Sequence, residues 1–470
     1  MESENKKAVK AGVYYTICNF ATNGLYLLTT PIYTRLLSQE GYGVTATYNT
    51  WMALFTIICT LDLYSCIQIS RVDFENKSRE FLSSILSLSS ISIFIFYILF
   101  KLVDFVKPDI LGMPVILYDI LFLEILCRNV VTLFQQQNSA YLKYKEYIIV
   151  SMIIAFSGQL LSVLLVMQMR DGGYLGKIIG TSIPYFIVGI IIASIIMVRG
   201  KTVYNREYWK YGLKISVPLI PHHIAGSILT QFDRIVINML VGLGATALYS
   251  LASNYALIVQ VVWNSFNSAW VPWFYGQMKE DNISDIKYFV KIYAIGMSVV
   301  IVIAALIGPE AIFILGGAEY ADSAMVIPSF LLGIFFQFLY SLYVNIEFYY
   351  KKTKKLAVWT LLAAMINLVL NYALIPYFGY VAAGYTTLFS YFCLFIFHYR
   401  TAKKYEERDI YDLKNILYIA IGLTIIVISM HYIYHFVIIR YVLLLGVSIL
   451  FVLYCLKHRK EFIKMLNGGK

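Results

Sequence analysis

Long runs of apolar residues, separated by short polar segments, recur along the whole 470-residue chain. A helix needs about 20 apolar residues to cross the hydrocarbon core of a bilayer, and most of these runs reach that length. None has the alternating apolar and polar positions of a membrane β-strand. The pattern predicts an all-α polytopic membrane protein with about 14 transmembrane helices. The predicted spans are 11–35, 42–69, 81–103, 115–136, 147–168, 174–198, 213–241, 246–275, 286–315, 321–349, 356–376, 380–399, 412–433 and 438–456.

The basic residues fall mainly on one side of these spans. The chain has 38 Lys and Arg residues against 27 Asp and Glu, a net charge of +11. With a cytoplasmic N-terminus, 30 basic residues lie on cytoplasmic segments, 6 on outer segments, and Arg128 and Arg234 within spans. This asymmetry is the positive-inside pattern, so both termini are predicted to be cytoplasmic. The distribution of basic residues therefore indicates membrane topology, and no nucleic-acid partner is inferred from the net charge.

Short loops and missing motifs narrow the range of functions. The outer loops are at most about 15 residues long, too short for a catalytic domain, and the inner loops cannot hold a nucleotide-binding domain. The turn Gly172–Lys177, predicted on the outer side, is the nearest match to a phosphate loop, but it has the wrong glycine spacing and no following Ser or Thr. The six cysteines lack CxxC spacing. We therefore predict no enzyme activity, no cofactor and no metal site.

A weak internal repeat relates the two halves of the chain. Tyr174 and Tyr380 lie 206 residues apart, as do Tyr185 and Tyr391, although chance matches in a chain with 40 tyrosines are the alternative. A repeat of six helices keeps the same topology, as in the paired halves of some transporters. The repeat predicts two pseudo-symmetric six-helix bundles followed by two further helices. The predicted boundaries are 1–205 for the N-lobe, 206–405 for the C-lobe, and 406–470 for helices 13 and 14 with a cytoplasmic tail.

Three segments carry a recognisable pattern. They are Leu27–Ser38 followed by Gly41-Tyr42-Gly43, Asp233–Gly242 followed by Ala247–Ala252, and Ile375–Gly384. Together they resemble the polysaccharide transporter branch of the MOP flippase superfamily, the Wzx-like O-antigen flippases, over at least residues 20–390. The Asp-Arg and Tyr-Ser pairs of the second segment are the most specific part. Asp62 departs from the pattern, because many relatives have a small residue there.

The resemblance implies two six-helix bundles in a V shape that work by alternating access. It implies a flippase that moves undecaprenyl-pyrophosphate-linked oligosaccharide repeat units, for O-antigen, capsule or exopolysaccharide, from the inner to the outer leaflet of the bacterial cytoplasmic membrane. Membrane lipids, a polysaccharide polymerase and the chain-length machinery are the further partners it implies. Because multidrug antiporters share the fold, an ion-coupled small-molecule antiporter is the alternative. A membrane enzyme of the same pathway is a third possibility, disfavoured by the short outer loops.

Arginines in or beside the bilayer are the candidate substrate-binding residues. Charges inside a span are costly and usually functional, and a guanidinium matches the oxygens of a pyrophosphate. The candidates are Arg35, Arg128 and Arg234. The alternatives are snorkelling of Arg35 to the outer headgroups and structural ion pairs of the other two. Glu124 stands four residues before Arg128, on the same helix face, and can pair with it.

Acidic residues within the spans are the candidates for ion coupling or for orienting the arginines. They are Asp62, Glu124, Asp233 and Glu347. For Asp62 and Glu347 the alternatives are interfacial helix caps or loop salt bridges. The adjacent His222 and His223 diverge on a helix, and we interpret them as core histidines rather than as metal ligands.

Overall fold

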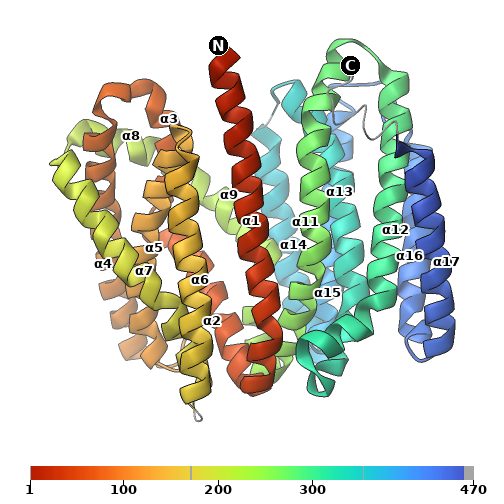
Figure 1. Ribbon diagram of the computed structural model, residues 1–470, viewed down its shortest axis with the longest axis horizontal. Helices are drawn as coiled ribbons and strands as arrows, with labels where there is room; N and C mark the ends of the chain where they lie inside the picture. The colour runs from red at the N-terminus through yellow and green to blue at the C-terminus, as the bar shows by residue number, and fades with distance from the viewer. Residues whose placement is uncertain (1, 170–171, 353, 460–470) are drawn as a thin grey trace. The chain divides into compact units, whose positions relative to one another are not determined.

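The computed structural model describes residues 2–169, 172–352 and 354–459, and this part of the chain is helical without a strand (Figure 1). The predicted tail at 460–470 lies outside the described residues. The chain divides into two compact units, Met1–Ala247 and Leu248–Lys470. The segment 206–247 therefore groups with the first unit, while the lobe boundaries expected from the repeat stay a prediction.

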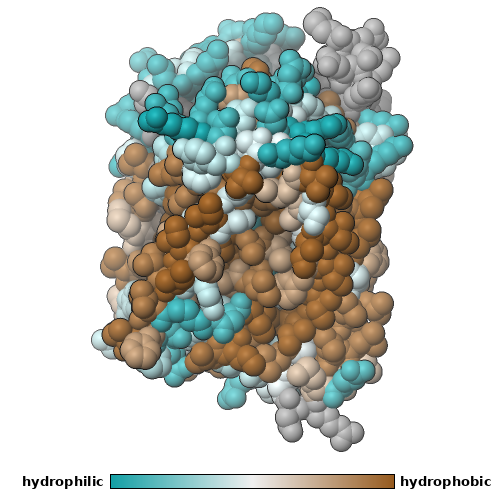
Figure 2. Space-filling view, turned by 90° about the vertical axis from the view of Figure 1, so that its left-hand side faces the viewer, coloured by the Kyte–Doolittle hydropathy of each residue, from teal (hydrophilic) through white to brown (hydrophobic). Residues whose placement is uncertain are grey.

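The first unit contains ten complete α-helices among its described residues, with short 3-10 and π turns between some of them. They are α1 (Glu2–Leu36), α2 (Gln39–Cys59), α3 (Ile67–Asp73), α4 (Ser78–Val106), α5 (Ile116–Ala140), α6 (Tyr144–Gln168), α7 (Gly173–Gly200), α8 (Arg206–Ser216), α9 (Ile220–Ser227) and α10 (Asp233–Leu240). Their surface carries an apolar band, with hydrophilic side chains gathered mainly at one end (Figure 2). On α7, Ile187, Ile190 and Val198 are more than half exposed, as suits helices that face lipid.

The second unit is built from the remaining long helices. They are α11 (Leu243–Lys279), α12 (Ile283–Gly316), α13 (Ile327–Tyr349), α14 (Lys354–Phe378), α15 (Tyr380–Ala402), α16 (Leu413–Ile433) and α17 (Val437–Lys457). Within this unit α13 packs most extensively against α15, and α12 packs against both α16 and α17. A 3-10 segment, Ala318–Val326, joins α12 to α13.

Each of the fourteen predicted spans coincides with helix in the described residues. Among the described residues, ten helices are long and apolar enough to cross a membrane, and eleven if the pair Gln39–Cys59 and Leu63–Asp73, bent by 58°, counts as one span. The other predicted spans correspond to α1, α5 and the broken segment α8–α10. These three carry more polar and charged side chains, and most of the candidate site residues lie on them. The prediction of an all-α polytopic membrane protein is confirmed.

Glycines let α7 approach its neighbours closely. A Cβ placed on Gly180 would lie 2.3 Å from the Cα of Ser162 on α6, and one on Gly189 would lie 3.0 Å from the Cβ of Cys127 on α5. Without these side chains the helix backbones can pack in contact, as small residues allow in membrane bundles. The close packing fixes α5, α6 and α7 around the polar cavity described below.

Candidate functional site

A polar cavity of about 310 Å³ lies within the first unit, between α1, α5, α6 and α7. Arg128 is its one charged side chain among the described residues. The other polar side chains of the wall include Asn19, Asn23, Tyr26, Gln135, Gln159 and Tyr185. Amides, phenols and a guanidinium are groups that hydrogen-bond or stack on sugars and bind phosphate oxygens. The cavity can therefore accommodate a polar, anionic group inside an otherwise apolar unit.

Helical periodicity produces this wall. On α1, Thr22 and Asn23 lie three and four residues after Asn19, and Tyr26 lies four and three residues after those two, which places all of them on one helix face. The hydroxyl of Thr22 also donates to the carbonyl of Cys18, so the polar face does not disrupt the helix backbone. The polar stripe of α1 thus faces the cavity, and its local sequence pattern is sufficient to explain it.

Arg128 is held in place by Glu124 and Tyr185. Its Nε donates to Glu124 Oε1 at 2.6 Å, its Nη2 lies 2.6 Å from the same oxygen, and its guanidinium lies 4.0 Å from the centre of the Tyr185 ring. The other oxygen of Glu124 accepts hydrogen bonds from the hydroxyls of Tyr48, at 2.7 Å, and Ser182. The i,i+4 ion pair is therefore present, and it is part of a network contributed by α2, α5 and α7.

The network leaves one edge of the guanidinium toward the cavity. The Glu124 carboxylate is 1% exposed, whereas the Arg128 side chain is 29% exposed. Within the described residues, Nη1 of Arg128 has no hydrogen-bond partner. Glu124 thus orients the arginine and offsets its charge, and Nη1 remains able to donate to an anion in the cavity. Glu124 itself is too enclosed to contact a bound molecule.

Asp62 is brought together with His223, 161 residues further along the chain. Asp62 is fully buried, its Oδ2 lies 2.8 Å from His223 Nδ1, and it also accepts from the Ser65 hydroxyl. Its Oδ1 is buried and has no hydrogen-bond partner among the described residues. Leu61 and Asp62 both have left-handed backbone, with φ of 53° and 54°, at the 58° bend that follows α2. Two adjacent non-glycine residues in this conformation store strain, which often marks a functional position.

Glu347 forms a second carboxylate–histidine pair, in the second unit, and here both side chains are buried. Its Oε1 lies 2.7 Å from Nδ1 of His398 on α15, and both side chains are at most 1% exposed. Its Oε2 has no hydrogen-bond partner in the part of the chain that the structure describes, and the His398 ring stacks on Tyr340. Each pair therefore joins a carboxylate of one helical segment to a histidine of another.

Asp233 and Arg234 follow a π-helical turn, Ile228–Phe232, that interrupts the helix between α9 and α10. Such turns occur frequently at functional sites. Asp233 is buried, whereas Arg234 is half-buried and its Nη1 donates to the carbonyl of Thr230 at 3.2 Å. Arg35 is exposed in the last turn of α1. Neither Arg35 nor Arg234 borders the polar cavity, so Arg128 alone of the three predicted arginines lines it.

Lys177 is a buried cation that the sequence analysis assigned to an outer turn. The structure places it within α7, 8% exposed, with its Nζ 3.1 Å from the hydroxyl of Thr45. The ammonium also lies 4.6 and 4.4 Å from the ring centres of Tyr33 and Tyr42. Tyr33 in turn donates to Gln159, a residue of the cavity wall, at 2.7 Å. The sequence signal that could have indicated a buried Lys177 is its position four residues into an apolar run.

Comparison with known proteins shows which family this chain belongs to. The family profile described as "Polysaccharide biosynthesis protein" matches residues 8–279. The chain is 23% identical to "Lsg locus putative protein 1" of Haemophilus influenzae, over 80% of this chain and 95% of that protein.

Two solved structures have similar folds. A lipid II flippase, MurJ, in an inward closed conformation has a TM-score of 0.71 at 14% identity and covers 96% of this chain and 100% of its own. An inward-facing multidrug resistance transporter of the MATE family of the MOP superfamily has a TM-score of 0.60 at 15% identity, covering 85% and 99%.

The apolar spans, the two helical units and the polar cavity define a multi-pass membrane protein with the fold of flippases and transporters. The chain belongs to the polysaccharide biosynthesis protein family. The resemblance noted in the sequence to the polysaccharide transporter branch of the MOP superfamily is thereby confirmed.

Proposed function

We propose that this protein is a flippase that moves a lipid-linked oligosaccharide across the bacterial cytoplasmic membrane, from the inner to the outer leaflet. The polar cavity around Arg128 is the observation that carries the proposal. An undecaprenyl-pyrophosphate headgroup needs a hydrated, polar path with a cation, while its lipid chain can stay in the bilayer. The family membership and the fold shared with a lipid II flippase support the same class of cargo.

Arg128 is proposed to contact the pyrophosphate of this cargo. Its guanidinium is fixed by Glu124 and Tyr185 and has one donor edge directed to the cavity. The pairing with Glu124 keeps the binding of the anion moderate, which suits a cargo that must be released in the other leaflet. The neighbouring amides and phenols of the wall are positioned to hydrogen-bond or stack on the sugars.

The test is translocation in vesicles. The purified protein would be reconstituted with a fluorescent lipid-linked oligosaccharide, and the fraction protected from an external glycosidase would be followed with time. Arg128→Gln should reduce the initial rate by about tenfold or more, since it removes a charge-assisted contact. Arg400→Gln is the matched control, because Arg400 is exposed at the end of α15 and distant in sequence from the cavity wall. Equal rates for wild type and Arg128→Gln would refute the assignment.

We further propose that Asp62 and His223 couple translocation to proton movement. Asp62 is buried, lies in strained backbone and is incompletely hydrogen-bonded within the described residues, so a change of its protonation would alter the bend that follows α2. Asp62→Asn should abolish the dependence of the rate on an imposed pH gradient. Asp73→Asn, at an exposed position on α3, is the control. A gradient dependence that is unchanged in Asp62→Asn would exclude this coupling site.

An ion-coupled small-molecule antiporter is the second candidate function. The two carboxylate–histidine pairs, Asp62–His223 and Glu347–His398, favour it, because such exchange needs protonatable groups. The same vesicles would be loaded with a fluorescent cationic drug under a pH gradient. Drug efflux together with no movement of the lipid-linked sugar would favour the antiporter over the flippase.

A further inference from the structure

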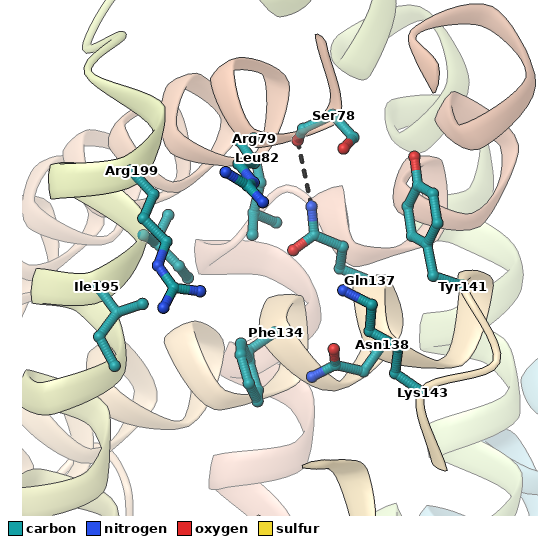
Figure 3. A pocket seen from close by; sticks show the side chains of 11 residues that line it. Ser78, Arg79, Leu82, Phe134, Gln137, Asn138, Tyr141, Lys143, Ile195 and Arg199 are labelled. Carbon is teal, nitrogen blue, oxygen red and sulfur yellow. Dashed lines mark hydrogen bonds between the residues drawn. The ribbon is translucent and has the colours of Figure 1, made fainter. Parts of the chain in front are cut away.

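A second polar pocket, of about 280 Å³, lies at one end of the first unit and is separate from the Arg128 cavity. It is bordered by the start of α4, the end of α5 and the end of α7 (Figure 3). Three basic side chains, Arg79, Lys143 and Arg199, contribute to its wall, and no Asp or Glu does. The charge pattern of the loops predicts this end to be cytoplasmic.

The fold itself holds two of these cations together. Gly200, next to Arg199, packs against α4 so closely that a Cβ there would lie 2.4 Å from the carbonyl oxygen of Arg79. The guanidinium groups of Arg79 and Arg199 and the ammonium of Lys143 point toward the space between the helices (Figure 3). Among the described residues, no carboxylate forms an ion pair with any of the three. Converging like charges of this kind are stabilised by an anion.

A buried donor in the same wall independently points to a ligand. Asn138 is only 6% exposed, and its Nδ2 has no hydrogen-bond partner within the described chain. Its neighbour Gln137 is oriented by a hydrogen bond of 3.2 Å from Nε2 to the carbonyl of Ser78. Buried amide donors are nearly always satisfied, so a missing partner at a basic pocket is explained by an acceptor that occupies it.

The other wall of the pocket is apolar and leads toward lipid. Ile195 borders the pocket and is 37% exposed. Ile191 and Ile187 lie one and two turns from it on the same face of α7 and are 54% and 56% exposed. An anionic group in the pocket would thus have an apolar stripe of about 12 Å beside it, the arrangement that a headgroup and an acyl chain require. This favours a lipid over a soluble phosphate.

We propose that this pocket binds the phosphate headgroup of an anionic membrane glycerophospholipid, with an acyl chain along the Ile187–Ile195 face of α7. Arg79, Arg199 and Lys143 neutralise the phosphate, and Asn138 donates to one of its oxygens. Basic pockets between helices on the cytoplasmic side are the expected recognition mode for such lipids. The site is distinct from the transport cavity, so the proposal does not depend on the identity of the cargo.

Native mass spectrometry of the full-length protein in detergent tests this directly. The protein would be incubated with phosphatidylglycerol or with phosphatidylcholine of the same acyl chains, and retained lipid would be counted. Wild type should retain phosphatidylglycerol in preference to phosphatidylcholine. Arg79→Gln/Arg199→Gln should lose this preference by roughly tenfold or more, since two charge-assisted contacts are removed. Arg79→Lys/Arg199→Lys keeps the charges and should restore much of it.

The matched control is Arg206→Gln/Lys210→Gln, which removes two exposed charges from α8 without touching the pocket. It should retain the lipid as wild type does. Equal retention of both lipids by wild type, or unchanged retention in Arg79→Gln/Arg199→Gln, would overturn the proposal. A separate arm uses inorganic phosphate alone and measures thermal stability. Stabilisation by phosphate that vanishes in Arg79→Gln/Arg199→Gln, with no lipid selectivity, would show that the ligand is a soluble phosphate and overturn the lipid assignment.

Discussion

The ion pair of Glu124 and Arg128 should contribute measurably to the stability of the first unit. Glu124 accepts hydrogen bonds from Arg128, Tyr48 and Ser182, and it is 1% exposed. Glu124→Gln keeps the shape of the side chain but removes the negative charge. The guanidinium then faces the cavity without its counter-ion, so the folded state should be destabilised.

The structure sets the size of this effect. Breaking a fully buried ion pair costs about 3–5 kcal/mol, whereas a hydrogen bond to a charged group contributes about 1.5–3 kcal/mol. Arg128 borders a cavity large enough for water and is 29% exposed, which weakens the interaction relative to a fully buried pair. We therefore expect a coupling free energy between Glu124 and Arg128 of about 1.5–3 kcal/mol.

A double-mutant cycle measures this coupling. Wild type, Glu124→Gln, Arg128→Gln and the double variant would be unfolded in detergent by titration with a denaturing surfactant, and the free energies of unfolding compared. The pair Lys101–Asp119, at 2.7 Å and with side chains 35% and 57% exposed, provides the reference cycle, and its coupling should be below about 1 kcal/mol. A Glu124–Arg128 coupling no larger than that of the reference pair would refute the reasoning.

Three further outcomes follow from other sites. Hydrogen bonds from Arg408 lower the pKa of Glu406 to about 2. The contribution of this carboxylate to stability is therefore complete above about pH 4.5 and is lost as the pH falls through about 2. Glu406→Gln should flatten that part of a profile of stability against pH. Gly180→Leu should lower the thermal midpoint and disturb the cavity, because its Cβ would lie 2.3 Å from the Ser162 backbone, whereas Gly226→Ala, where a Cβ meets nothing within 4 Å, should cause little change. Glu347→Gln should lower the thermal midpoint less in a His398→Gln background than in wild type, because the two side chains share one buried contact of 2.7 Å, and equal losses in both backgrounds would contradict that.

The local part of the site could be predicted from the sequence. Glu124 and Arg128 lie four residues apart on one helix, so their pairing required only the helical repeat. The polar face of α1 at Asn19, Asn23 and Tyr26 follows from the same repeat. Both features depend on contacts within a turn or two of helix, which the order of residues fixes directly.

The distant pairings could not be predicted. His223 was interpreted as a core histidine, and Asp62 as a candidate for ion coupling with a helix cap as the alternative, yet the two meet across 161 residues. Lys177 was assigned to an outer turn, although Tyr33 and Tyr42 surround its ammonium. A charge in an apolar run shows that a partner must exist, but many polar side chains on other helices could serve, and only helix packing selects among them.

The sequence by itself determined that this is an all-helical membrane protein with a strong charge asymmetry, because lipid requires apolar spans about 20 residues long and topology follows the basic loops. The tertiary structure alone decided which of the three membrane arginines lines a cavity, and that Arg79 and Arg199 converge on a second pocket. One physical difference separates what the sequence determined from what the tertiary structure decided. The hydropathy of a segment is a local property, whereas the neighbours of a side chain depend on how closely helices pack and at which glycines they touch.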